Sequence, residues 1–401
     1  MSSLLQPITL GHTIELRNRV CMGAMTRNRC VDDNKPTDAS VKHYADRARD
    51  GAGLIVSEGT FICPTGSEYQ HPPVMWDQSH AQAWKKVTTA VHQEGGKIFF
   101  QAWHAGRCQH DEVPMLKEKN FPVLAPSQVP AAAGKYRFLK GTPGHTTNIT
   151  EINDPKTVVQ QFKAAAELAR DAGFDGIEIL AQGGYLIHNF LCSHANKRTD
   201  AYGGSVPNRC RFALEVVDAI SEIWGHSAIG IKICPTDDAN DSAVSYDELC
   251  ETYDYLIKHL VSREVGYINL SRRGCALGKD EDLFMSLDKN SYTPRSTANE
   301  LPCGFEPLHR FGDLIKYPGS RTMLMVNHEY TVAEADALVK EGKIDLVTFG
   351  RPFIYNPDVI TRIKRGIPFA TNDRGGHVYY GPYQDVNENY NDWPYSGENE
   401  R

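Results

Sequence analysis

This 401-residue sequence has no long hydrophobic run and no paired metal-binding cysteines. No segment approaches the roughly 18 consecutive apolar residues that a membrane-spanning helix needs. Residues 1–7 have neither the basic region nor the apolar region of a secretory signal. The ten cysteines are scattered without a C-x-x-C pair, and no histidines cluster at zinc spacing. We therefore expect a cytoplasmic protein with free buried thiols, no bound metal and no membrane contact.

An excess of positive charge is also missing. The chain carries 43 Lys and Arg against 50 Asp and Glu, which gives a net charge of −7. Such a balance does not favour nucleic acids or anionic membranes, so the expected partner is a small-molecule substrate. The composition leaves a monomer and a homodimer equally open.

Short apolar runs alternate with segments of helical period along the chain. The runs are typical of parallel strands buried on both faces. They span Arg19–Met25, Gly53–Ser57, Lys97–Trp103, Asp175–Leu180, Ala228–Cys234, Gly266–Leu270, Thr322–Val326 and Asp345–Phe349. Helices are expected at Asp38–Arg49, Ser79–Glu94, Asp154–Ala172, Pro207–Ile223, Ser245–Ser262, Phe305–Ile315, Thr331–Glu341 and Pro357–Arg365. This order predicts an α/β fold, a (β/α)8 TIM barrel. The rival, a doubly wound open sheet, lacks its G-x-G-x-x-G phosphate loop here.

Two connections are long, residues 105–153 after the third strand and 271–304 after the sixth. Loops this long inside a compact domain are usually lids or binding loops. Both leave the carboxyl ends of strands, where barrel enzymes keep their chemistry. The tail at 367–401 has no helical period and is expected to cross the same rim, so residues 1–401 are expected to form a single domain.

Residues that packing does not need stand at several strand ends. Residues 24–27 read Ala-Met-Thr-Arg, and residues 101–107 read Gln-Ala-Trp-His-Ala-Gly-Arg. Longer blocks are Arg-Thr-Asp-Ala-Tyr-Gly-Gly-Ser at 198–205 and Gly-Arg-Pro-Phe-Ile-Tyr-Asn-Pro-Asp at 350–358. Together, from residue 7 to residue 394, these motifs closely resemble the old yellow enzyme family of FMN-dependent ene-reductases, especially its fungal branch.

The resemblance implies FMN as cofactor and NADPH or NADH as hydride donor. It implies that Tyr185 donates a proton to the substrate, which is typically worth roughly 10²–10⁴-fold in rate. Thr26 would bond the flavin near O4 and N5, and Gln101 its pyrimidine edge. Gly350 and Arg351 would hold the phosphate. The residues implied to bind FMN are Ala24, Met25, Thr26, Gly59, Gln101, Lys232, Gly350 and Arg351.

The sequence departs from the family pattern where the substrate is activated. The family's carbonyl-binding pair, His with His or Asn, falls at Leu180 and Gly183. Loss of one such donor typically costs roughly 10²–10³ in rate. Gln182 lies between these positions, but its side chain is expected to point to the other face of the strand. His104 and His188 are candidate replacements, with a structural role as the more ordinary interpretation of each.

Further departures concern charge. Lys232 occupies the position of the family arginine beside the flavin. Lysine keeps the positive charge, but it cannot donate the two parallel hydrogen bonds of a guanidinium. The family's glycine turn at the phosphate falls at His328 and Glu329. Arg272 and Arg273 would bind an acidic substrate or the phosphate of a nicotinamide cofactor. The alternative is that both are solvent-exposed loop residues without a ligand. The residues expected to contact substrate are Trp103, Leu180, Gly183 and Arg272.

These patterns predict an FMN-dependent, NAD(P)H-linked oxidoreductase that acts on an activated C=C bond of a specialised, secondary-metabolite-like substrate. The reaction is reduction, desaturation or isomerisation, and simple enones should be poor substrates. The alternative is an old-yellow-enzyme-like barrel that acts as a non-redox isomerase or cyclase with altered or lost flavin use. The departures at residues 180, 183, 232 and 328–329 favour this alternative. The retained Thr26, Gln101, Tyr185, Gly350 and Arg351 oppose it.

Overall fold

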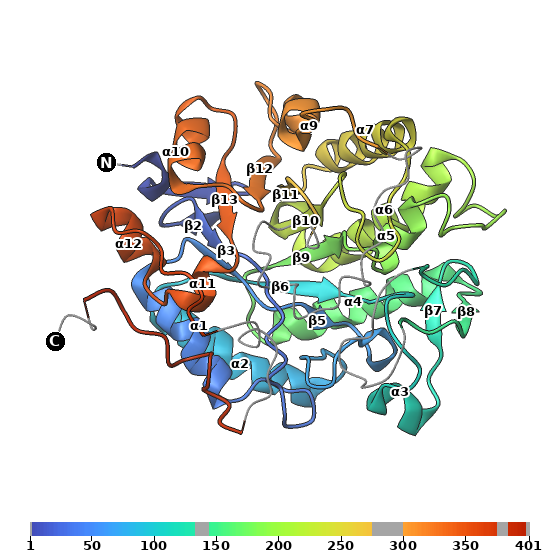
Figure 1. The fold of residues 1–401 in the computed structure, drawn as a ribbon, viewed down its shortest axis with the longest axis horizontal. Coiled ribbons are helices and arrows are strands. Elements are labelled where there is room, and N and C mark those ends of the chain that lie inside the picture. The colour runs from blue at the N-terminus through green and yellow to red at the C-terminus, as the bar shows by residue number, and fades with distance from the viewer. Residues whose placement is uncertain (1, 133–143, 275–299, 375–383, 398–401) are drawn as a thin grey trace.

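Parallel strands form a closed ring at the centre of the molecule (Figure 1). The computed structural model describes residues 2–132, 144–274, 300–374 and 384–397. The strands of the ring are β3 (Val20–Met22), β4 (Leu54–Val56), β6 (Ile98–Trp103), β9 (Gly176–Ala181), β10 (Ile229–Ile233), β11 (Tyr267–Ser271), β12 (Met323–Asn327) and β13 (Leu346–Phe349). They pair in the order β4-β3-β13-β12-β11-β10-β9-β6, and pairing of β4 with β6 closes the ring. The closure confirms the (β/α)8 barrel and excludes an open sheet.

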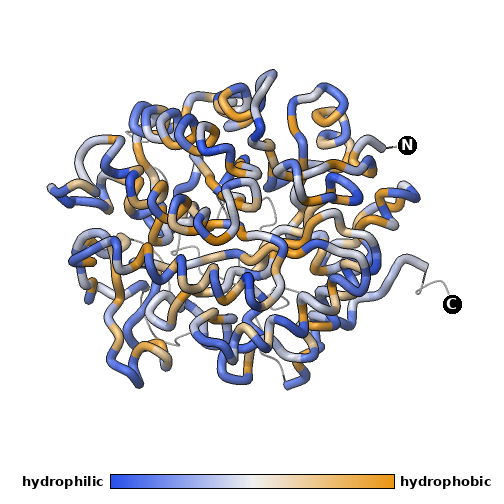
Figure 2. The backbone as a smooth tube through the Cα atoms, turned by 180° about the vertical axis from the view of Figure 1, so that it is seen from behind, coloured by the Kyte–Doolittle hydropathy of each residue, from blue (hydrophilic) through white to orange (hydrophobic). Residues whose placement is uncertain are grey.

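Helices return the chain along the outside of the ring. They are α1 (Asp38–Asp50), α2 (Gln78–Gln93), α4 (Pro155–Asp171), α6 (Val206–Trp224), α7 (Tyr246–Ser262), α9 (Pro307–Ile315), α10 (Val332–Lys340) and α12 (Val359–Arg365). Figure 2 shows hydrophobic residues concentrated in the central strands and alternating with hydrophilic ones along the helices. Helix α4 begins and ends with typical capping residues. Asp154 caps its amino terminus directly before Pro155, and Gly173 follows its carboxyl terminus in the left-handed conformation, at a φ of 83°.

The amino-terminal end of the barrel is closed by a hairpin that the sequence patterns missed. Strands β1 (Ile8–Leu10) and β2 (Ile14–Leu16) pair antiparallel. Leu10 and Leu16 are buried among inward-facing barrel residues such as Leu54 and Phe99. Three-residue strands are too short to show a period. Because this end is filled, a ligand site belongs at the other end, where the strands finish.

Short helices and strands lie in the connections between the barrel elements. The long connection after β6 contains α3 (Pro114–Lys119), β7 (Val123–Ala125) and β8 (Ile149–Glu151), and β7 pairs with β8 in parallel. The remaining short elements are η1 (Ser3–Leu5), β5 (Thr60–Phe61), η2 (Pro64–Gly66), α5 (Leu186–Leu191), η3 (His226–Ala228) and α11 (Pro352–Tyr355). Most of the long connection expected after β11, residues 275–299, lies outside the described residues.

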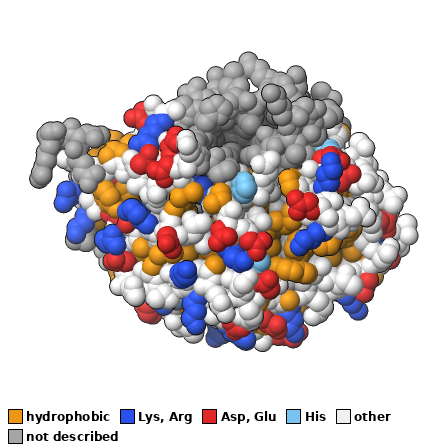
Figure 3. Space-filling view, turned by 90° about the horizontal axis from the view of Figure 1, so that it is seen from below, with side chains coloured by type: hydrophobic (Ala, Val, Ile, Leu, Met, Phe, Trp, Pro, Cys, Tyr) orange, Lys and Arg blue, Asp and Glu red, His pale blue; other side chains and the backbone are white. Residues whose placement is uncertain are grey.

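The surface mixes charges of both signs. On the face in Figure 3, acidic and basic side chains are interspersed with hydrophobic ones. An interspersed surface of this kind does not present the single-sign field that nucleic acids recognise. Within the described ranges, no helix is both long and apolar enough to cross a membrane.

The carboxyl-terminal segment, residues 384–397, packs on the loop after β3. Tyr390 is fully buried, and its ring stacks on that of His43 in α1 with centroids 4.0 Å apart. The guanidinium groups of Arg27 and Arg29 lie 4.9 and 4.8 Å from the centroid of the Tyr390 ring. Both groups also donate hydrogen bonds to backbone carbonyls of the two residues that precede Tyr390. We infer that this segment belongs to the same domain as the barrel.

We expect Tyr390→Ala to destabilise the protein by about 3 kcal/mol or more, because it leaves a cavity and removes two cation–π contacts. Tyr317→Ala is the matched control, since Tyr317 is 49% exposed. Thermal unfolding followed by circular dichroism measures both variants. Equal melting temperatures for the two would contradict the docking of the segment.

Candidate active site

The residues singled out from the sequence converge at the carboxyl ends of the barrel strands. In chain order they are Ala24, Met25 and Thr26 after β3, Gly59 after β4, Gln101 and Trp103 on β6, Leu180 on β9 with Gly183 and Tyr185 beyond it, Lys232 on β10, Arg272 after β11, and Gly350 and Arg351 after β13. The register places Gln101 beside Glu178. It places Lys232 between Leu180 and Asn269. This is the end of a barrel that carries catalytic residues.

A buried carboxylate organises the barrel interior beneath this rim. Glu178 is fully buried and accepts hydrogen bonds from Gln101 Nε2 at 2.7 Å and from Tyr267 OH and Asn269 Nδ2 at 3.0 Å each. A carboxylate only accepts, so the Gln101 amide nitrogen must face Glu178 and its Oε1 must face away. Glu178 was missed in the sequence, although a lone acidic residue inside an apolar strand was the available signal.

The polar network continues to the rim. Asn327 Nδ2 donates to Asn269 Oδ1 at 3.2 Å and to Ser271 Oγ at 3.0 Å. Ser271 Oγ in turn donates to Gln182 Oε1 at 2.8 Å. The expectation that Gln182 points to the other face is therefore wrong. The two-residue period of β9 continues one step past its end and keeps Gln182 on the inward face with Leu180.

An apolar cluster stands at the same rim. The ring of Trp103 stacks on Phe61, with centroids 4.3 Å apart, and meets Tyr185 edge-on at 4.7 Å. Tyr69 and Leu180 complete the cluster. Trp103 Nε1 is buried and has no acceptor among the described residues. Phe61, Tyr69 and Trp103 are buried, so the apolar surface that the cluster offers a ligand comes from Leu180 and Tyr185.

The turn after β9 explains the missing carbonyl-binding pair. Gly183 has a φ of 77°, and its N–H donates to Asp237 Oδ2 at 2.6 Å. A Cβ on Gly183 would lie only 2.6 Å from Tyr185 Cε2. The ring of Tyr185 thus fills the space that a side chain at 183 needs. Leu180, which is 9% exposed, offers only apolar surface.

His104 and His188, the candidate replacements for the carbonyl-binding pair, each accept a hydrogen bond from a backbone N–H group. His188 Nδ1 accepts from Gly184 N at 3.1 Å, and its Nε2 lies 3.4 Å from Tyr253 OH. His104 Nδ1 accepts from Gly106 N at 3.0 Å, and its Nε2 is shielded from solvent. Burial lowers the pKa of His104 to about 3, so its ring is neutral near pH 7. These contacts support the structural interpretation of both residues.

Positive charge gathers at the ends of β10 to β13. Burial lowers the pKa of His328 to about 4, and the charges of Arg351, Lys232 and Arg273 act in the same direction, while Glu329 opposes them. These three residues, called the cation cluster below, stand at the ends of β10, β11 and β13, the strands around β12, whose end carries His328. A Cβ on Gly350 would meet only Met25, at 3.6 Å, so packing alone does not require glycine there. Cations beside a glycine suit a phosphate.

These features fit FMN. Gln101 presents an acceptor suited to the N–H of a pyrimidine edge, and the cation cluster suits the phosphate. Gly59, which the family resemblance implies to bind FMN, also has a packing reason to be glycine. A Cβ on Gly59 would lie 2.5 Å from the Trp103 ring and 3.1 Å from Gln101 Oε1, so protein packing already requires glycine.

Arg272, an expected substrate contact, is already paired with protein groups. It forms ion pairs with Glu306 at 3.1 Å and with Glu334, and its guanidinium stacks 3.7 Å from the centroid of the Tyr330 ring. It also donates to the backbone carbonyl of Glu329 at 3.3 Å. Two carboxylates neutralise its charge, and its role is to hold the turn after β12. Its neighbour Arg273 is the exposed cation of the two.

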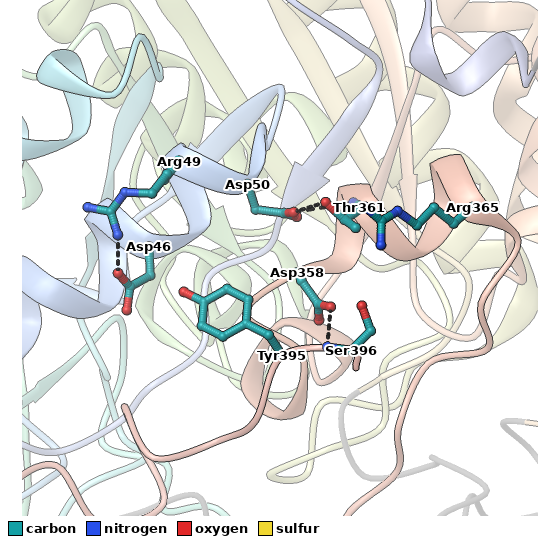
Figure 4. Close-up of a pocket in the computed structure, with 8 residues that line it drawn as sticks. All are labelled: Asp46, Arg49, Asp50, Asp358, Thr361, Arg365, Tyr395 and Ser396. Atoms are coloured by element: carbon teal, nitrogen blue, oxygen red, sulfur yellow. Dashed lines mark hydrogen bonds and ion pairs between the residues drawn. The ribbon is translucent and has the colours of Figure 1, made fainter. Parts of the chain in front are cut away.

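A cavity of about 260 Å³ lies on the outside of the barrel, between α1, α12 and the carboxyl-terminal segment (Figure 4). It is lined by Asp46, Arg49, Asp50, Asp358, Thr361, Arg365, Tyr395 and Ser396. Its carboxylates are engaged: Asp46 pairs with Arg49 at 2.9 Å, Asp50 accepts from Thr361 Oγ1 at 2.6 Å, and Asp358 accepts from Ser396 N at 2.7 Å. These pairs tie the segment to the barrel, and the candidate site remains at the rim.

The barrel, the buried Gln101 amide and the cation cluster define a flavin-dependent barrel oxidoreductase. Residues 3–279 match the sequence profile of the NADH:flavin oxidoreductase / NADH oxidase family. The chain belongs to this family, which confirms the resemblance to old yellow enzymes.

Relatives match over almost the whole chain. A probable flavin mononucleotide-dependent alkene reductase of Leishmania infantum is 32% identical over 397 residues, 98% of this chain and 97% of the relative. The chanoclavine-I aldehyde reductase fgaOx3 of Penicillium roqueforti is 32% identical over 398 residues, with 99% and 98% covered. The structure of morphinone reductase in complex with tetrahydroNAD is similar at a TM-score of 0.81 and 31% identity, with 100% and 99% covered. The chain is thus an FMN-dependent oxidoreductase that acts on C=C bonds and takes hydride from a nicotinamide cofactor.

We expect Glu178→Gln to lower the free energy of unfolding by about 1–3 kcal/mol, because the new amide turns a donor toward one of three buried donors. Glu222→Gln is the control, since Glu222 is 64% exposed in its pair with Lys163 and should contribute under about 1 kcal/mol. Urea unfolding compares the two. If both variants unfold at the wild-type urea concentration, Glu178 is not the buried acceptor described here.

Proposed function

We propose that this enzyme reduces or desaturates an activated C=C bond of a specialised substrate. Apolar contacts, rather than side-chain hydrogen bonds to a carbonyl oxygen, hold this substrate. The observation that carries the proposal is the site around Leu180 and Gly183. Leu180 lies in the apolar cluster with Trp103, and the Tyr185 ring fills the space beside Gly183. A substrate carbonyl finds no side-chain donor at either position.

Residues of the chain would hold FMN, which supplies hydride transfer when it is bound. Gln101 Oε1 accepts from the pyrimidine edge, Thr26 bonds near N5 with Ala24 and Met25 against the ring, and Gly350 with Arg351 holds the phosphate. Lys232 has a half-buried side chain on an inward position of β10. Its charge stabilises the negative charge of a reduced flavin.

Tyr185 is the proposed proton donor to the substrate carbon. Its ring is held edge-on by Trp103, and it packs where Gly183 has no side chain. These contacts restrict the direction of the hydroxyl. A positioned acid of this kind is typically worth roughly 10²–10⁴-fold in rate.

The substrate is a molecule with an apolar part that packs on Leu180 and Tyr185, which the buried rings of the cluster support from behind. Two relatives support a specialised substrate, because their names specify chanoclavine-I aldehyde and morphinone. We place the enzyme in the cytoplasm as a monomer or a homodimer. The nine described cysteines are all free, and seven of them are buried, as a reducing compartment allows.

A second candidate function is a non-redox isomerase or cyclase, which the same replacements at Leu180 and Gly183 favour. It predicts that product forms without net consumption of NADPH or NADH. The cation cluster and the Gln101 amide favour the redox function, because both suit a bound flavin.

We expect the purified protein to show flavin absorbance that NADPH or NADH bleaches without oxygen. In Tyr185→Phe, bleaching should keep its wild-type rate, whereas reoxidation by concentrated cyclohexenone should slow by about 10²-fold, because only the hydroxyl is lost. Stopped-flow absorbance measures the two half-reactions. A protein that binds no FMN would overturn the redox proposal, and an equal loss in both half-reactions would contradict the role of Tyr185.

We expect Leu180→His to raise the rate of reoxidation by cyclohexenone about 10-fold or more, because it restores one carbonyl donor. Leu180→Met is the apolar control and should give no gain. Gly183→Asn should not help, since its Cβ would lie only 2.6 Å from Tyr185 Cε2. Absence of a gain in Leu180→His would show that position 180 does not face the carbonyl.

A further inference from the structure

The turn after β12 has an unusual backbone. His328 and Glu329 have φ values of 73° and 61°. The other consecutive left-handed pairs without glycine in the described residues are Asp33–Asn34 and Asn240–Asp241, residue types that tolerate this region. Glu329 is not such a residue type, so the turn stores strain. Strain of this kind persists when surrounding contacts enforce it, and it concentrates at ligand sites.

The contacts that enforce the turn come from Arg272. Its backbone N–H donates to the Asn327 carbonyl at 3.1 Å, and its side chain donates to the Glu329 carbonyl and stacks on Tyr330. The pairs of Arg272 with Glu306 and Glu334 fix it in turn. The turn is therefore held in place before any ligand binds.

The His328 side chain is aimed into the protein. It is 13% exposed, and its Nε2 is buried with no hydrogen-bond partner among the described residues. The nearest carboxylate oxygen recorded for it, Glu329 Oε1, is 4.0 Å away. A buried polar atom without a partner is costly unless a ligand supplies one.

We propose that His328 Nε2 donates a hydrogen bond to the FMN phosphate, a task for which the family resemblance implies only backbone N–H groups of a glycine turn. The inference rests on the proposed function. The charges of Arg351, Lys232 and Arg273 act on His328 and would favour a phosphate beside it, where the imidazole would replace part of what the glycine turn supplied.

The charges around His328 set the pH dependence of FMN binding. Burial and the positive charges of Arg351, Lys232 and Arg273 lower the pKa of free His328 to about 4, while Glu329 acts in the opposite direction. A phosphate dianion beside the ring raises that pKa, so binding takes up a proton and tightens as the pH falls. The second ionisation of a phosphate ester lies near about 6, so the dianion persists above about pH 6.5.

The test compares FMN with riboflavin, which lacks the phosphate. Each is titrated into flavin-free full-length protein, and quenching of flavin fluorescence gives the Kd. The variants are His328→Gly, which removes the imidazole and relieves the strain, and His328→Asn, which tolerates the left-handed region and does not titrate. Glu264→Gly is the matched control, because Glu264 is also left-handed at a φ of 55° but lies beyond α7.

We expect both His328 variants to weaken FMN about 10- to 100-fold and riboflavin less than about 2-fold. His328→Gly should nevertheless raise the melting temperature of the flavin-free protein by about 1–2 °C. From pH 8.5 to 6.5 the preference for FMN over riboflavin should rise in the wild type and stay flat in His328→Asn. Glu264→Gly should raise the melting temperature and change neither Kd.

Two results would overturn the inference while the proposed function stands: unchanged FMN affinity in His328→Gly, or an equal loss for FMN and riboflavin. Wild-type protein that binds neither flavin would overturn the proposed function itself, and the inference with it.

Discussion

The carboxylate of Glu178 lies inside the barrel, where a charge is tolerated only if hydrogen bonds satisfy it. Gln101 supplies its bond from β6 on one side of β9, and Tyr267 and Asn269 supply theirs from β11, beyond β10 on the other side. Because the carboxylate can only accept, it fixes the orientation of the Gln101 amide and leaves Oε1 as an acceptor. The polarity of the flavin edge of the site thus follows from one buried charge.

Relative to the family pattern, the substrate end of the site has lost polar side chains and the phosphate end has gained them. At the substrate end, Leu180 and Gly183 have removed polar groups, and the Tyr185 ring has taken the vacated space. At the phosphate end, His328 and Glu329 have added side chains to a turn whose backbone conformation suits glycine. We propose that the first change alters what the enzyme accepts and that the second changes how it holds its cofactor.

The barrel strands were predictable because parallel strands buried on both faces are continuous apolar runs, as in β6 and β9. The hairpin of β1 and β2 was not, because three residues cannot show a period. Gln101 and Arg351 were singled out from motifs, and their roles stay predictions. Glu178 was overlooked, the face of Gln182 was predicted wrongly, and the carboxylate partners of Arg272 were not foreseen, because these features depend on partners that no local motif includes.

The sequence by itself determined the barrel, the family and the class of cofactor, because apolar periodicity and strand-end motifs are local properties of the chain. Only the tertiary structure decided that Glu178 orients Gln101, 77 residues away, and that Glu306 and Glu334 neutralise Arg272. It also decided that Tyr185 occupies the space beside Gly183. Each of these depends on which side chains from distant segments share one small volume, and barrel closure sets that volume.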